Sequence, residues 1–266
     1  MEQKAQVETS QIFKTKVFET AILAGEILLE SGAEIVRVED TMRRIARAFQ
    51  LENFDIYVLT SGLFASADID DRRLNSRIKE IQAASPHFGK IDEVNEISRQ
   101  LVSGHYTVED AYERMKLVKR MPSYPVFVHA FGAGLGAICF CYLLDGSPRD
   151  SLFSFLAGFL MWILVVYFRK WGMKRTLCNV LGSAIACSLC IVFHSIGFGD
   201  SVDKMIIGTL IPLIPGVSFV NGIRDLSDNN FLSGMVRLLD VAVATTCMAI
   251  GSGVVIEFAN RLGGLL

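Results

Sequence analysis

An apolar segment in the last third of the chain is interrupted by prolines and then becomes charged, GTLIPLIPGVSFVNGIRDLSDNN (residues 208–230). Pro212 and Pro215 each remove a backbone donor, and each ring clashes with a carbonyl four residues back, so a helix should break here. In lipid, the freed carbonyls need protein or a wet cavity around them. Because transporters build substrate sites from such discontinuous helices, the break predicts a translocation site; a simple proline kink is the alternative.

Side chains that could handle a charged solute follow this break. Arg224 could attract a carboxylate, and Asp240 could accept a proton or pair with Arg224 or Arg237. An acid within a membrane segment is costly and usually faces a partner or a water-filled path; an Arg237–Asp240 ion pair is the structural alternative. Asp225 is expected in a polar loop, which leaves Asp240 as the better candidate to titrate. The predicted translocation residues are Pro212, Pro215, Gly216, Asn221, Arg224, Asp225, Arg237 and Asp240.

The charges of the chain are unevenly distributed. Of the 266 residues 51% are hydrophobic, and the net charge of −2 gives no sign of nucleic-acid binding. Residues 1–120 carry 37 Asp, Glu, Lys and Arg, whereas residues 121–266 carry 17. This asymmetry predicts a membrane α-helical bundle of about five transmembrane helices, residues 121–266, preceded by a cytoplasmic α+β domain, residues 1–120.

Five apolar stretches approach the ~20 residues that a membrane-spanning helix needs. They lie at about 125–144, 151–168, 176–198, 204–220 and 235–259. The loop at 169–175 has four basic residues, whereas the loop at 145–150 has one Arg and two Asp. The positive-inside rule therefore places the N-terminal domain and the loops at 169–175 and 221–234 in the cytoplasm and the C-terminus outside. No signal peptide is visible, and a multi-pass membrane protein is expected.

The N-terminal domain presents a crowded polar helix face. The sequence SGAE is typical of a capping box in which Ser31 caps an amide and Glu34 reaches back. The helix that follows should bury Ile35 and residues at i, i+3 and i+4 spacing from it. Its polar face, with expected Glu39–Arg43 and Arg37–Asp40 pairs, is either solvated or docked against the membrane gate. The residues singled out on this face are Glu34, Arg37, Glu39 and Asp40.

The remainder of this domain shows strand and helix patterns. Residues 53–60 alternate like a strand, 72–81 suggest another, and helices are expected at about 9–29, 91–102 and 107–119, the last capped by Thr107.

Four sequence blocks together resemble the threonine/serine exporter family. They are LLESGAEIVRVEDTMRRI (28–45), TSGLFAS (60–66), PGVSFVNGIRDL (215–226) and SGMVRLLD (233–240). The resemblance implies secondary export driven by an ion gradient. With about five spans, the chain is similar to the short form of the family, whose second half is a separate small membrane protein and which is associated with dicarboxylates such as succinate. It departs from the family in LSDNNFLSG (226–234), which lacks a glycine midway.

The function expected is therefore that of an exporter subunit for threonine/serine-type amino acids or dicarboxylates. The expected partners are the small-molecule substrate, a second membrane subunit and the bilayer, and association of identical copies stays open. No phosphate-binding loop, HExxH or GxSxG occurs, so no catalytic residue, cofactor or metal is expected. The alternatives are a membrane-anchored sensor and, less favoured, an intramembrane aspartyl enzyme that uses Asp225 and Asp240.

Overall fold

The computed structural model describes residues 2–70, 73–81 and 86–261 and divides the chain into two compact units. Met1–Ser123 and Val217–Leu238 form the first, called here the N-terminal unit. Tyr124–Gly216 and Leu239–Leu266 form the second, the membrane unit. The division falls directly after the proline break and again within the last helix. Four of the eight predicted translocation residues, Asn221, Arg224, Asp225 and Arg237, thus belong to the N-terminal unit.

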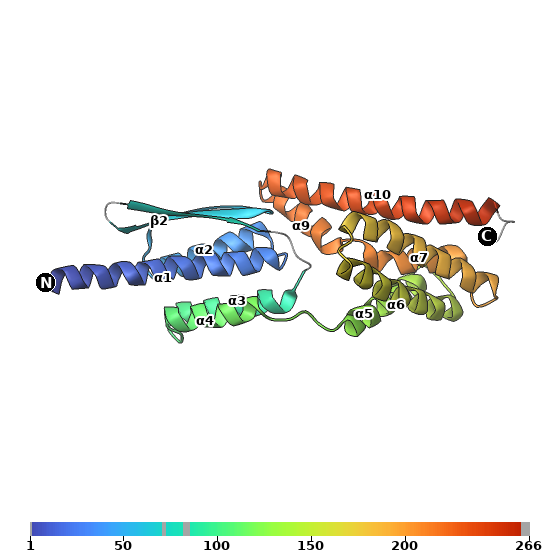
Figure 1. Ribbon diagram of the computed structural model, residues 1–266, viewed down its shortest axis with the longest axis horizontal. Coiled ribbons are helices and arrows are strands. Elements are labelled where there is room, and N and C mark those ends of the chain that lie inside the picture. The colour runs from blue at the N-terminus through green and yellow to red at the C-terminus, as the bar shows by residue number, and fades with distance from the viewer. Residues whose placement is uncertain (1, 71–72, 82–85, 262–266) are drawn as a thin grey trace. The chain divides into compact units, whose positions relative to one another are not determined.

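Helices and one small sheet make up the N-terminal unit (Figure 1). The expected helices at 91–102 and 107–119 and strands at 53–60 and 72–81 are confirmed with slightly shifted ends, although Arg72 lies outside the described residues. The elements are α1 (Glu2–Glu30), α2 (Ile35–Ala48), β1 (Glu52–Leu59), β2 (Gly62–Asp70), β3 (Arg73–Glu80), α3 (Phe88–Val102) and α4 (Val108–Lys119).

The antiparallel sheet, in the order β1-β2-β3, covers one side of α1 and α2, while α3 and α4 cover the other. On β2, Leu63 and Ala65 are buried and Phe64 between them is exposed, as the alternation of a strand requires. The predicted apolar face of α2 is confirmed, because Ile35, Val38, Met42 and Ile45 are all fully buried. This packing holds the turn between α1 and α2 in place.

Six helices and one 3-10 turn follow residue 124 among the described residues. They are α5 (Val126–Leu143), α6 (Pro148–Lys170), α7 (Arg175–Ser195), α8 (Val202–Leu210), the 3-10 turn η1 (Ile211–Leu213), α9 (Gly216–Ser227) and α10 (Phe231–Arg261). Four of these helices are long and apolar enough to cross a membrane, and a fifth span exists if the interrupted pair α8–η1 and α9 counts as one. The residues beyond 261, and with them the expected outer C-terminus, lie outside the described part.

The prediction of a polar loop at 221–234 is wrong. Helix α9 continues to Ser227 and α10 starts at Phe231, so only three residues connect them. Asn229 adopts a positive φ of 63°, a conformation that asparagine tolerates better than most residues. It thereby closes the turn without the glycine that the resemblance led us to expect midway in this loop.

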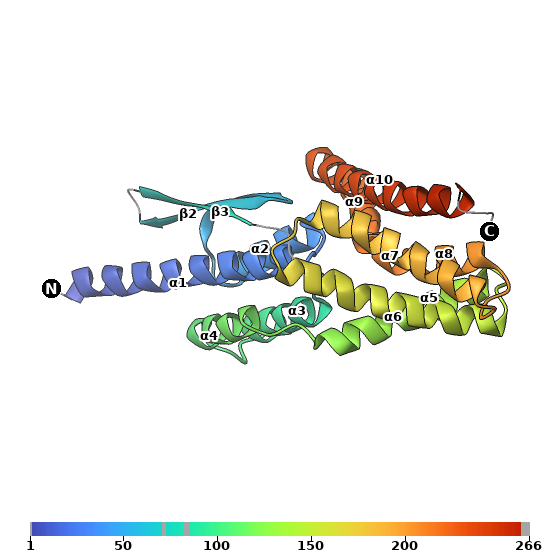
Figure 2. The ribbon, with the colours of Figure 1, turned by 45° about the vertical axis from the view of Figure 1, so that its right-hand side comes forward.

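Glycines allow the membrane helices to pack closely. Helices α5, α6 and α7 run alongside one another (Figure 2). Gly134 of α5 faces Phe155 of α6, whereas nothing lies near Gly132. On α8, a methyl group at Gly208 would lie 2.9 Å from the carbonyl oxygen of Ala137. That neighbour is backbone, so only a shift of one helix could make room.

Replacing Gly208 by alanine should therefore destabilise the membrane unit. We expect Gly208→Ala to lower the free energy of unfolding by about 1–3 kcal/mol, the usual cost of overpacking. The measurement is an SDS unfolding titration of the purified protein in mixed micelles. Gly132→Ala on α5 is the matched control and should cause no loss, and equal losses in both variants would contradict the packing argument.

Candidate functional site

The break in the apolar segment is a 3-10 turn followed by one extended residue. Ile214 has φ −66° and ψ 129°, which ends the helical path before Pro215. Two backbone hydrogen bonds partly replace those that a continuous helix would form here. The Ile214 amide donates to the Ile211 carbonyl at 3.0 Å, and the Gly216 amide donates to the Ile214 carbonyl at 2.8 Å. The predicted helix break is thus confirmed.

Glycines on two neighbouring helices accommodate this break. Gly136 of α5 faces the ring of Pro212, and Gly182 of α7 faces Leu213. Neither glycine has a side chain that would push the 3-10 turn away. The break is therefore packed between helices, which is the setting that non-helical backbone in a membrane requires.

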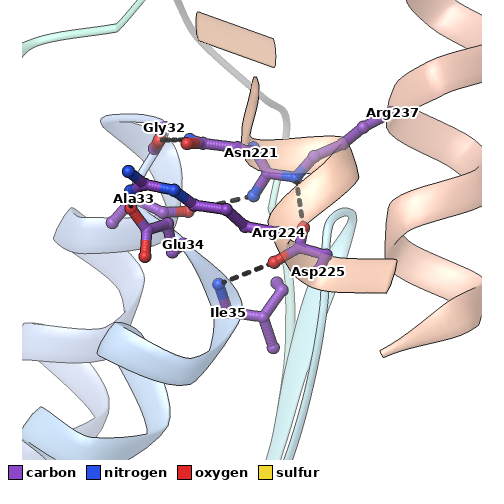
Figure 3. Close-up of polar contacts among 8 residues, drawn as sticks. All are labelled: Gly32, Ala33, Glu34, Ile35, Asn221, Arg224, Asp225 and Arg237. Atoms are coloured by element: carbon purple, nitrogen blue, oxygen red, sulfur yellow. Dashed lines mark hydrogen bonds and ion pairs between the residues drawn. The ribbon is translucent and has the colours of Figure 1, made fainter. Parts of the chain in front are cut away.

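Three polar side chains of α9 reach the turn between α1 and α2 (Figure 3). Asn221, Arg224 and Asp225 lie at i, i+3 and i+4, on one face of the helix. The Asn221 amide donates to the Gly32 carbonyl at 2.9 Å, and Arg224 forms an ion pair with Glu34. We call the set of Gly32, Ala33, Glu34, Ile35, Asn221, Arg224, Asp225 and Arg237 the polar cluster.

The turn exposes its carbonyls because α1 ends in a Schellman motif. Gly32 has a positive φ of 79°, and the Ala33 amide returns to the Leu28 carbonyl at 3.0 Å. The expected capping box of Ser31 and Glu34 is wrong: Ser31 belongs to the end of α1, and Glu34 precedes α2 without a side-chain cap. The first turn of α2 is left without an acceptor from its own sequence neighbourhood.

Asp225, 190 residues away, supplies that acceptor. Its Oδ1 accepts the Ile35 amide at 3.3 Å, which places a negative charge at the positive end of the α2 dipole. Its Oδ2 lies 2.9 Å from Nε of Arg237, and Arg237 also donates to the Ala33 carbonyl at 2.9 Å. Asp225 is therefore buried in a helix rather than exposed in a loop, because the turn and Arg237 give its charge the partners it needs.

The polar cluster contains one buried ion pair and one exposed ion pair. The side chains of Asp225 and Arg237 are 1% and 11% exposed, whereas that of Arg224 is 57% exposed. The buried pair should hold α9 against the turn, since breaking a buried pair leaves an uncompensated charge. The exposed Arg224–Glu34 pair contributes little to stability and remains accessible to a solute.

Asp240 pairs with Arg175 of α7, at 3.1 Å, within the membrane unit. The expected pairings of Asp240 with Arg224 or Arg237 do not form, because those arginines bind Glu34 and Asp225. The deeper burial of Asp225 gives it the greater need for a counter-charge. Arg175, a partner that the sequence did not single out, was visible only as one of the basic residues of a loop.

The polar face of α2 joins the cluster through Glu34 alone. Arg37 and Asp40 are exposed, and in the part of the chain that the structure describes neither they nor Glu39 and Arg43 form the expected ion pairs. Glu39 is half-buried, and burial raises the pKa of its carboxyl, opposed by Arg43 and by the Val58 amide.

Comparison with known proteins identifies relatives over most of the chain. Residues 19–259 match the model of the threonine/serine exporter family. A "Probable threonine/serine exporter" of Mycobacterium tuberculosis is 23% identical over 239 residues, which are 89% of this chain and 45% of that protein. "Pheromone-regulated membrane protein 10" of Candida albicans is 22% identical over 84% of this chain and 21% of its own length.

An uncharacterized protein of Schizosaccharomyces pombe is 21% identical over 84% of this chain and 30% of its own. The chain therefore spans less than half the length of the curated relatives it matches. No solved structure matches it.

The cluster predicts that its two arginines differ in their effect on stability. Asp225→Asn and Arg237→Gln should each lower the free energy of unfolding by about 3 kcal/mol, because each leaves a buried charge without its partner. Arg224→Gln, on the same face of α9, should cost about 1 kcal/mol or less. SDS unfolding titrations would measure all three. If Asp225→Asn is as stable as Arg224→Gln, the buried pair does not hold α9 in place.

Proposed function

Because the chain belongs to the threonine/serine exporter family, we propose that it is a subunit of a secondary transporter that exports small polar metabolites across the bacterial plasma membrane. It is a multi-pass membrane protein of an exporter family. The N-terminal unit would lie in the cytoplasm, which places the polar cluster on the side from which a solute enters.

The observation that carries this proposal is the sequence of features along one segment. A membrane segment is broken at Pro212–Gly216, and the helix directly after the break presents Asn221, Arg224 and Asp225. A discontinuous span with polar groups beside it is the usual construction of a transporter site. A plain membrane anchor would need neither feature.

The charges of the cluster favour an amino acid over a dicarboxylate. Its two arginines balance two acids, Glu34 and Asp225, so its formal charge is zero. An α-amino acid needs donors for its carboxylate, such as Arg224, and acceptors for its ammonium, such as Glu34 and the carbonyls of the turn. A dicarboxylate needs an excess of positive charge, which the cluster lacks. Threonine or serine is the substrate class that we propose.

A second membrane subunit would complete the transporter. The match covers 45% of the Mycobacterium tuberculosis relative, so that protein contains a further segment outside the match. A separate membrane protein that supplies an equivalent of this segment is the partner we propose. Association of identical copies is the alternative, and co-purification with the product of a neighbouring reading frame would distinguish the two.

The pairing of the acids disfavours an aspartyl enzyme. Such enzymes need two carboxylates that share one proton. Asp225 and Asp240 each have their own arginine, Arg237 in the N-terminal unit and Arg175 in the membrane unit.

Efflux from loaded vesicles would test the proposed function. With the partner present, wild-type chain should release labelled threonine or serine faster than labelled succinate. Arg224→Gln should lower amino-acid efflux at least tenfold while leaving stability nearly unchanged, because Arg224 is exposed and meets the solute carboxylate.

Arg149→Gln, an exposed arginine at the start of α6, is the matched control and should transport normally. Unchanged efflux in Arg224→Gln would remove the cluster from the proposal and leave export itself standing. No efflux from wild type with its partner, combined with solute binding to the chain, would favour the sensor.

A further inference from the structure

The turn between α6 and α7 concentrates positive charge, of which the acids of the described residues neutralise only that of Arg175. Arg169, Lys170, Lys174 and Arg175 fall within seven positions, and the sequence contains no acidic residue from 151 to 199. Arg175 pairs with Asp240. Arg169, Lys170 and Lys174 are exposed, and no acid of the described ranges lies within ion-pair distance of them. We call residues 169–175 the basic turn.

Favourable interaction with a helix dipole explains only two of these four positive charges. Arg169 and Lys170 stand in the last turn of α6, where cations complement the helix dipole. Lys174 and Arg175 stand at the first positions of α7, where positive charge opposes the dipole, and the first turn of α7 has no acid. Lys174 also provides no side-chain cap. An anion from outside the chain would resolve this unfavourable arrangement.

The position and the residue types of the basic turn suit the membrane surface. The turn joins two helices that are long and apolar enough to cross the bilayer, so it lies at the level of the lipid headgroups. Trp171 is 68% exposed, and its ring lies 4.6 Å from that of Tyr167, an aromatic pair of the kind enriched at membrane interfaces. Gly172, with φ 79°, closes the turn, and the Met173 amide donates to the Phe168 carbonyl at 3.2 Å across it.

We propose that the basic turn binds the phosphate headgroup of an anionic phospholipid. Arg169, Lys170 and Lys174 supply the positive charge, and Trp171 anchors the turn beside the upper part of the acyl chains. This goes beyond export, because it assigns a lipid ligand to residues outside the polar cluster. The proposal also goes beyond the positive-inside rule, which concerns only the orientation of basic loops. It requires that the folded protein contacts anionic lipid selectively.

Trp171 can report this contact directly. The chain has two tryptophans, so Trp162→Phe leaves Trp171 as the single fluorophore. The two brominated lipids are compared in mixed micelles whose other components are kept the same. Brominated phosphatidylglycerol should quench the fluorescence of Trp171 at lower mole fractions than brominated phosphatidylcholine. Lys170→Gln and Lys174→Gln should each weaken the apparent affinity for phosphatidylglycerol about fivefold, and 0.5 M salt should weaken it as well.

Two controls separate a binding site from general charge attraction. Arg149→Gln, at the other end of α6, should leave the quenching by phosphatidylglycerol unchanged, and Lys170→Arg with Lys174→Arg should preserve it. Equal quenching by the two lipids, or an equal effect of Arg149→Gln, would overturn the proposal. The test needs neither solute nor partner, so its failure would not bear on export.

Discussion

A buried carboxylate with two partners organises the region on which function is proposed to depend. Asp225 accepts the first amide of α2 and pairs with Arg237, and both partners are needed because a buried charge is costly without them. Remove the turn of residues 32–35 and Asp225 loses its donor; remove Arg237 and it loses its counter-charge. The arrangement makes α9 part of the N-terminal unit, although in sequence it continues an apolar segment.

This grouping changes how the proline break should be understood. A break alone frees backbone groups, and on α5 and α7 the glycines beside Pro212 and Leu213 simply accommodate it. Its further consequence is that the chain beyond Gly216 packs with a different unit. Rearrangement of the solvent-accessible pair Arg224–Glu34 would cost little, while the buried pair keeps α9 in place. An exporter of the proposed kind needs both properties, a readily exchanged contact for the solute and a stable position for the helix that carries it.

Charge is used differently in the two units. In the N-terminal unit the cluster is internally balanced, acid against arginine, which is the basis for proposing a zwitterionic solute. In the membrane unit, Asp240 is the single acid of the described residues that pairs with the basic turn, and three cations are left for the proposed lipid ligand. Both patterns follow from the same rule, that charge placed away from bulk water needs a partner, and they differ in whether that partner is the chain or its surroundings.

The sequence by itself determined most of the elements of this protein, although not the helix that replaces the expected loop at 221–234 or strand β2. Apolar length predicted the spans, periodicity predicted the buried face of α2, two prolines predicted the break, and four sequence blocks identified the family that the comparison then showed. These features are local, or depend on residue type alone, and are therefore readable without coordinates.

Only the tertiary structure decided the partners. Nothing in the sequence assigns Asp225 to the amide of Ile35, because a backbone amide carries no signature of residue type and lies 190 positions away. The expected capping box failed for the same reason: Ser31 and Glu34 have the right types, but the Schellman turn at Gly32 directs Ser31 to the end of α1. The two acids also differ in burial. Arg237 pairs with the enclosed Asp225 rather than with the half-exposed Asp240.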